Sequence, residues 1–66
     1  PRRGKKELRI FHAIQSGVNP PTFEFSVNEA RLVHFSYQRY LENRLRQAFG
    51  FEGTPVRLVF KAKGER

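Results

Sequence analysis

Three short segments of the chain alternate hydrophobic and polar residues, which is the pattern of half-buried β-strands. Residues 7–15 alternate imperfectly, because hydrophobic side chains fall on both faces of that segment. Residues 22–27 and 56–61 alternate cleanly, and residues 17–21 contain a glycine and two prolines that predict a loop. The clean strands predict a core made of Phe23, Phe25, Val27, Val56, Leu58 and Phe60.

The strongest helical pattern covers residues 35–49, and Gly50 is placed to end that helix. Its apolar half predicts contacts with the sheet for Tyr37, Tyr40, Leu41, Leu45, Ala48 and Phe49. Arg44 falls inside this half, where its side chain either follows the apolar surface out to water or presents a cation to a docking partner. A shorter helix is predicted over residues 29–33, with Asn28 as its N-cap.

The predicted order of elements, β-β-α-β, is typical of a small α+β domain in which a helix packs on one face of a three-stranded mixed sheet. A right-handed crossover through the helix makes the second and third strands parallel, and a hairpin makes the first strand antiparallel to the second. The start of the first strand and the end of the third strand therefore lie at the same edge of the sheet. We expect a single domain over residues 1–66, with basic extensions at residues 1–6 and 62–66.

Positive charge is concentrated at the two ends of the sequence. The chain has 13 Lys and Arg against 6 Asp and Glu, which gives a net charge of +7. Residues 1–9 hold five cations against one Glu and residues 57–66 hold four against one, whereas residues 10–56 are balanced. Because the fold brings the two ends together, we predict a basic edge that contacts nucleic-acid phosphates, against the alternative of a merely solubilising surface. The basic edge consists of Arg2, Arg3, Lys5, Lys6, Arg9, Arg57, Lys61 and Lys63.

Several classes of chemistry are excluded by residues that the chain lacks. Without Cys or Asp it can form no disulfide, thiol nucleophile or Ser-His-Asp triad, and His12 and His34 have no such partners for a metal site. We therefore predict no catalytic residue, no metal and no enzyme activity in these residues. The lack of Cys, of a membrane-spanning apolar run and of a signal peptide predicts a cytoplasmic location. The first residue is Pro and not Met, so we expect the chain to be a piece of a longer protein.

Two features suggest specific nucleic-acid contacts. The segment Gly50-Phe51-Glu52-Gly53 matches the G-x-x-G loop with which KH domains clamp a nucleic-acid backbone. It lies between the long helix and the last strand, however, where a helix cap and a turn explain both glycines, so we expect no KH-type clamp. The many aromatic residues suggest base stacking, but alternation assigns most of them to the core and leaves only Phe11 and Phe51 open.

Three motifs, in the same order along the chain, resemble a known family. They are Pro20-Pro21-Thr22-Phe23, then His34-Phe35-Ser36-Tyr37-x-Arg39-Tyr40-Leu41-Glu42-Asn43, then Phe49-Gly50-Phe51-Glu52-Gly53-Thr54-Pro55-Val56-Arg57. The sequence from about residue 6 to residue 61 resembles the C-terminal KH-like domain of the Der, or EngA, family of bacterial ribosome-assembly GTPases. The resemblance implies a type II KH-like fold in which the helix that normally precedes the first strand is largely missing from this chain.

The resemblance also implies a function. The parent protein would have two consecutive GTPase domains and help the large (50S) ribosomal subunit to mature, and this domain would dock on the first GTPase domain and assist contact with ribosomal RNA. No G-x-x-x-x-G-K-[ST] motif occurs in these residues, so GTP, GDP and Mg²⁺ are expected in the parent's GTPase domains and no cofactor here. Candidates for docking are Pro20, Pro21, Arg39, Asn43 and Arg44. The alternative is a purely protein-docking module that senses the nucleotide state of the GTPase without binding RNA.

Overall fold

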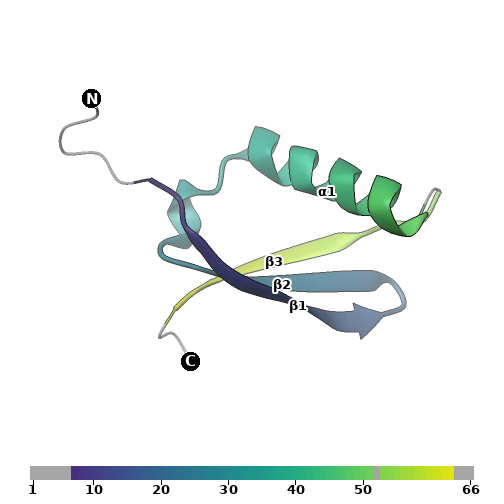
Figure 1. Cartoon of the computed structure of the whole chain (residues 1–66), viewed down its shortest axis with the longest axis horizontal. Coiled ribbons are helices and arrows are strands. Elements are labelled where there is room, and N and C mark those ends of the chain that lie inside the picture. The colour runs from purple at the N-terminus through teal and green to yellow at the C-terminus, as the bar shows by residue number, and fades with distance from the viewer. Residues whose placement is uncertain (1–6, 52, 64–66) are drawn as a thin grey trace.

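A computed structural model describes residues 7–51 and 53–63 of the chain. The elements are β1 (Ile10–Val18), β2 (Pro21–Val27), the short 3-10 helix η1 (Ala30–Leu32), α1 (Phe35–Phe49) and β3 (Arg57–Ala62). The strands form one sheet in the order β1-β2-β3, and α1 lies across one of its faces (Figure 1). β1 is antiparallel to β2 and β3 is parallel to it. The predicted α+β architecture, with its mixed three-stranded sheet, is confirmed.

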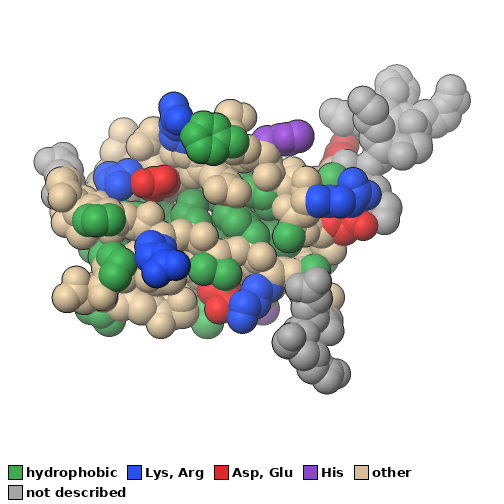
Figure 2. Space-filling view, turned by 180° about the vertical axis from the view of Figure 1, so that it is seen from behind, with side chains coloured by type: hydrophobic (Ala, Val, Ile, Leu, Met, Phe, Trp, Pro, Cys, Tyr) green, Lys and Arg blue, Asp and Glu red, His purple; other side chains and the backbone are tan. Residues whose placement is uncertain are grey.

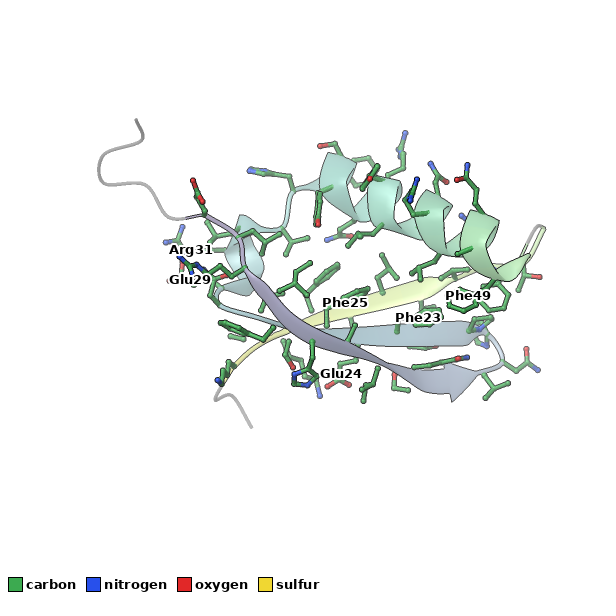
Figure 3. The ribbon with its side chains drawn as sticks, in the orientation of Figure 1. Phe23, Glu24, Phe25, Glu29, Arg31 and Phe49 are labelled. Atoms are coloured by element: carbon green, nitrogen blue, oxygen red, sulfur yellow. The ribbon has the colours of Figure 1, made fainter. Side chains whose placement is uncertain are left out.

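The core lies between β2 and the helix layer. β2 alternates buried and half-buried side chains, and Figure 3 shows Phe23 and Phe25 pointing toward α1 while Glu24 points away from it. Phe25 stacks on Phe60 of β3 with 5.1 Å between ring centroids, and Val27 has no exposed surface. The clean alternation of the second and third predicted strands therefore identified the core residues of the sheet.

Helix α1 begins and ends where the sequence predicts. His34 precedes it in extended backbone, and Gly50 follows it in the left-handed region at φ 71°, with its N–H donating to the Arg46 carbonyl at 2.8 Å. A glycine adopts this conformation without the steric cost that a Cβ brings. Arg46 then holds the helix end in place, because it pairs with Glu42 at 2.8 Å and donates from Nε to the Thr54 carbonyl at 3.3 Å.

The buried face of α1 is narrower than the helical wheel predicts. Leu41 and Leu45 pack against the core, but Tyr40 is 54% exposed, so its predicted inward position is wrong. Phe49 reaches the ring of Phe23 at 6.1 Å between centroids and is still 60% exposed. The physical reason is the small width of the covered surface, since the helix packs on β2 and β3 with a stripe and not with half of its own surface.

Several element boundaries differ from the prediction. The strand ladder continues to Val18 and resumes at Pro21, so the connecting loop is only residues 19–20. Proline is tolerated at the first residue of a strand, which explains why the prolines do not lengthen the loop. β3 extends to Ala62, one residue into the predicted tail. The short helix is one 3-10 turn preceded by Glu29, and no side chain caps it, so Asn28 is not its N-cap.

Strand β1 is exposed on both faces. Every residue in it except Gly17 is exposed, including Ile10 and Val18, which pair with core-facing residues of β2 and so lie on the same side of the sheet as α1. The helix layer therefore covers β2 and β3 and leaves apolar positions of β1 uncovered. Among the described residues, no helix is long and apolar enough to cross a membrane.

Candidate nucleic-acid interface

The two ends of the described chain meet at one end of the sheet, which we call the Val27 end. Val27 of β2 pairs with Ile10 on one side and with Ala62 on the other. Just beyond this row, Lys63 donates its N–H to the Val27 carbonyl at 2.8 Å, and the Arg9 carbonyl accepts from the N–H of Asn28, the residue that follows β2, at 3.1 Å. The prediction that the fold joins the start of the first strand to the end of the third is confirmed.

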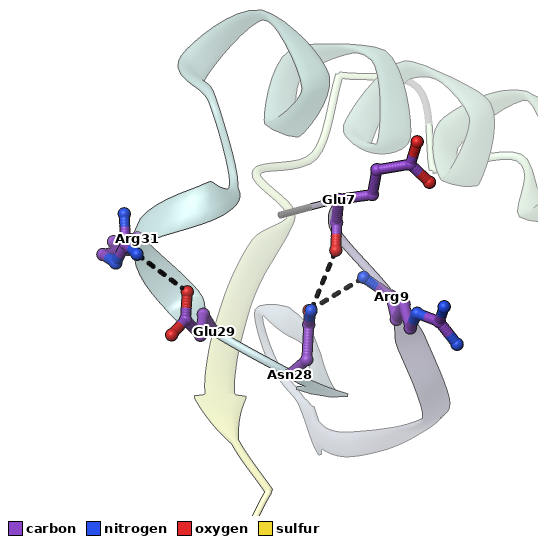
Figure 4. Close-up of polar contacts among 5 residues, drawn as sticks. All are labelled: Glu7, Arg9, Asn28, Glu29 and Arg31. Carbon is purple, nitrogen blue, oxygen red and sulfur yellow. Dashed lines mark hydrogen bonds and ion pairs between the residues drawn. The ribbon is translucent and has the colours of Figure 1, made fainter. Parts of the chain in front are cut away.

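Asn28 fixes the chain at the Val27 end. Its Oδ1 accepts a hydrogen bond from the Arg9 N–H at 2.8 Å, and its Nδ2 donates to the Glu7 carbonyl at 2.8 Å (Figure 4). Both contacts span about 20 residues of sequence. An Asn before a helix pattern usually signals a cap, but here the same polar groups satisfy the backbone of the distant segment that leads into β1.

Three members of the basic edge come together at the Val27 end, and one lies elsewhere. Arg9, Lys61 and Lys63 are exposed and lie around the ends of β1 and β3. Arg57 begins β3 and pairs with Thr22, so its predicted place in the basic edge is wrong. A strand rises about 3.3 Å per residue, which puts Arg57 roughly 17 Å from the last residue of β3. The remaining members, Arg2, Arg3, Lys5 and Lys6, lie outside the described residues.

The cations at the Val27 end have different neighbours. Lys61 lies 3.7 Å from the carboxylate of Glu24, which partly offsets its charge. Lys63 places its Nζ 5.0 Å from the ring centroid of Phe11. Figure 2 shows Lys and Arg side chains spread over the viewed face, above the helix as well as above the sheet. The described part of the basic edge is therefore a small group of cations in a generally basic surface.

The docking candidates divide into exposed and buried residues. Arg39, Asn43 and Arg44 are exposed on α1, whereas Pro21 is buried and Pro20 is half-buried. Pro21 therefore offers almost no surface to a partner in this structure. Arg44 is exposed, as both interpretations of its place on the helical wheel allow.

The start of α1 holds two aromatic contacts, on different sides of the helix, that the sequence patterns did not predict. The guanidinium of Arg39 lies 4.6 Å from the ring centroid of Phe35, which is 69% exposed. The rings of Tyr37 and Tyr40 stack next to each other at 6.0 Å. Phe35 lies opposite the apolar half of the helical wheel, and a phenylalanine at such a position was the signal available in the sequence.

Comparison with known proteins identifies the domain. A family model described as KH-domain-like of EngA bacterial GTPase enzymes, C-terminal, matches residues 1–61. The chain belongs to this family. The resemblance inferred from the three motifs is thus confirmed, and the matched region is the KH-like domain of these enzymes and not one of their GTPase domains.

Curated relatives agree with this assignment and show how small a share of their full length this chain matches. GTPase Der of Halothermothrix orenii is 62% identical over 63 residues, which cover 96% of this chain and 14% of that protein. GTPase Der of Moorella thermoacetica is 62% identical over 61 residues, which cover 92% of this chain and 14% of that protein. GTPase Der of Staphylococcus carnosus is 59% identical over 54 residues, which cover 82% of this chain and 12% of that protein. The chain spans about one seventh of the length of these relatives.

The G-x-x-G segment of this KH-like domain has a structural explanation. Gly50 and Gly53 both have positive φ, at 71° and 74°. In the turn that leads into β3, Thr54 donates its N–H to the Phe51 carbonyl at 3.1 Å. The segment thus ends α1 and turns the chain. His12 lies 3.2 Å from the Ser26 hydroxyl, and the described residues contain no cluster of His, Cys, Asp and Glu that could hold a metal.

Proposed function

We propose that this KH-like domain contacts ribosomal RNA through the basic edge, as an accessory domain of a two-GTPase-domain protein that takes part in maturation of the large (50S) ribosomal subunit. The family membership supports the role in a GTPase. The observation that carries the RNA contact is the meeting of Arg9, Lys61 and Lys63 at the Val27 end, in a chain with a net charge of +7.

Such an edge would recognise the phosphate backbone and not the base sequence. Lys and Arg attract phosphates by charge, which fixes position and orientation on the RNA but reads no base. Arg9 can in addition donate two parallel hydrogen bonds to one phosphate, whereas Lys61 and Lys63 act as point charges. Both kinds of contact release counterions from the RNA, so binding should weaken as salt rises.

An NMR titration tests this proposal directly. The isotope-labelled domain is titrated with a structured fragment of large-subunit ribosomal RNA at about 0.15 M salt, where long-range attraction between exposed charges is largely screened. We expect saturable amide shifts at residues 7–9 and 61–63, and weaker shifts at Arg57, which lies at the opposite end of the sheet. Absence of saturable shifts, or equal shifts over the whole surface, would contradict RNA contact through the basic edge.

A second candidate function is docking on the neighbouring GTPase domain in a way that senses bound nucleotide. The exposed aromatic residues at the start of α1, Phe35 beside Arg39 and Tyr40 beside Tyr37, favour it, because aromatic residues and Arg are enriched at the centres of protein interfaces. We infer that GTP or GDP and Mg²⁺ bind in the GTPase domains of such a cytoplasmic protein, since these residues contain no phosphate-binding loop.

Calorimetric titration of the domain with that GTPase domain, loaded with GDP or with a GTP analogue, tests the docking function. We expect binding to one state to be at least several-fold tighter, and Tyr40→Ala to weaken it, because truncating a central aromatic residue commonly costs more than 1 kcal/mol at an interface. Gln47→Ala, which changes another exposed residue of α1 that is neither aromatic nor a docking candidate, is the control. Equal or absent binding in both states would eliminate nucleotide sensing.

A further inference from the structure

The face of the sheet opposite α1 has both apolar and basic side chains. Residues that pair across the strands share a face, so Glu24, which points away from α1 in Figure 3, lies in a row with Ile14 and Val59. The next row toward the Val27 end contains His12, Ser26 and Lys61. Figure 1 shows α1 on the other side, and the described part of the chain places no helix against these rows. Ile14 is consequently 54% exposed.

Phe11 is the exposed aromatic residue of this region. It lies at an irregularity of β1, because Ile10 pairs with Val27 while His12 already pairs with Ser26. An extra residue in a strand re-aims its side chain, which explains why Phe11 breaks the alternation of the segment. Its ring is 46% exposed and has the Lys63 ammonium 5.0 Å from its centroid. An aromatic ring and a cation thus lie together on the basic edge.

We propose that an unpaired nucleotide of single-stranded RNA stacks its base on Phe11 while Lys63 binds an adjacent phosphate. This inference rests on the proposed RNA contact and specifies which form of RNA the basic edge prefers. Base stacking on an aromatic side chain needs a base that is free of its own helix, so a duplex cannot supply the partner. Stacking also works with every base, which fits an edge that reads no sequence.

The arrangement of charge favours RNA over a protein as the occupant. Lysine is depleted at protein interfaces, whereas an aromatic platform bordered by cations is the arrangement of single-strand binding surfaces. The cation–π contact between Lys63 and Phe11 is weak at an exposed site, so Lys63 can turn to a phosphate when a base covers the ring. Glu24 does not oppose this placement strongly, because Lys61 lies 3.7 Å from its carboxylate.

The experiment uses the indole introduced by Phe11→Trp as a reporter, because the chain contains no tryptophan. The variant is titrated with a short single-stranded RNA and with a duplex of the same length and composition. We expect saturable quenching by the single strand and little change with the duplex, because only an unpaired base can stack on the indole. Quenching of equal size by both RNAs would overturn the inference.

Affinities of the wild-type domain and two leucine variants complete the test, measured by the anisotropy of labelled RNA. Phe11→Leu should weaken single-strand binding about tenfold, which is within the range for loss of one stacked base, and change duplex binding less than about twofold. Phe35→Leu is the matched control, because Phe35 is also an exposed ring beside a cation but lies on α1. Thermal unfolding verifies that both variants remain folded, and the same affinities are compared in the complete GTPase that the proposed function describes.

The outcomes separate this inference from the proposed function. If both RNAs bind with salt-sensitive affinity and Phe11→Leu weakens neither, the basic edge stands and the stacking inference is wrong. If Phe11→Leu and Phe35→Leu lower single-strand affinity equally, the effect is not specific to Phe11 and the inference is again wrong. If neither RNA binds, the proposed function and the inference both fail, and a protein partner becomes the explanation for the exposed Phe11 ring.

Discussion

Replacing Phe25 with alanine is expected to unfold most of the domain at 25 °C. Phe25 lies in the central strand, is 7% exposed and stacks on Phe60 with 5.1 Å between ring centroids. The truncation therefore removes a buried ring and leaves a cavity beside the ring of Phe60. Such substitutions cost about 3–5 kcal/mol. A single core of this size supplies a total stability of about 3–5 kcal/mol, so the loss is comparable with the whole. Urea unfolding followed by circular dichroism measures it.

The control for this prediction is Phe35→Ala, which removes the same side chain from a site that is 69% exposed. Surface substitutions usually change stability by less than about 0.5 kcal/mol, so this variant should unfold close to the wild-type midpoint. Phe25→Leu should fall between the two, because it keeps most of the buried volume. A loss of less than about 1 kcal/mol for Phe25→Ala would mean that the β2 core does not hold the domain together.

The sequence predicts the parts of this fold that have one buried face. β2 and β3 each present apolar side chains to α1 at every second position. The alternation of apolar and polar residues in 22–27 and 56–61 predicts this arrangement. The relative directions of the strands followed from the handedness of the crossover. β1 could not be read in the same way, because it is exposed on both faces and its irregularity at Phe11 interrupts the period of two.

Two residues show why the candidate site was harder to predict than the fold. Arg57 is close to Lys61 in the sequence, but an extended strand carries the two toward opposite ends of the sheet. Asn28 has a side chain suited to capping a helix, and only the folded chain shows that its partners are the backbones of Glu7 and Arg9. Arg57 was misplaced because residues that are close in sequence were expected to be close in space. Asn28 was given the wrong partner because its role was inferred from its neighbours in sequence alone.

Reversing the charge of Lys61 and Lys63 together is expected to weaken binding of ribosomal RNA on the order of 100-fold at low salt. The double variant Lys61→Glu/Lys63→Glu removes two contacts with phosphate and adds two repulsive charges at the Val27 end. Each phosphate contact with a single strand contributes about 0.7 to the slope of log affinity against log salt, so the slope should flatten by about 1.4. Anisotropy titrations between about 50 and 200 mM salt measure both quantities.

Two single charge reversals test whether RNA binds a local site or responds only to the overall positive charge of the domain. Lys63→Glu and Arg57→Glu change the net charge equally, but only Lys63 lies at the Val27 end. If RNA binds the basic edge, Lys63→Glu should lower affinity several-fold more than Arg57→Glu, since exposed charges more than about 8–10 Å apart are largely screened at physiological salt. Equal losses would show that RNA responds to the total charge of the domain, and the predicted edge would then have no special role. Thermal unfolding of both variants verifies that any loss of affinity does not come from unfolding, since Lys63 and Arg57 are both exposed.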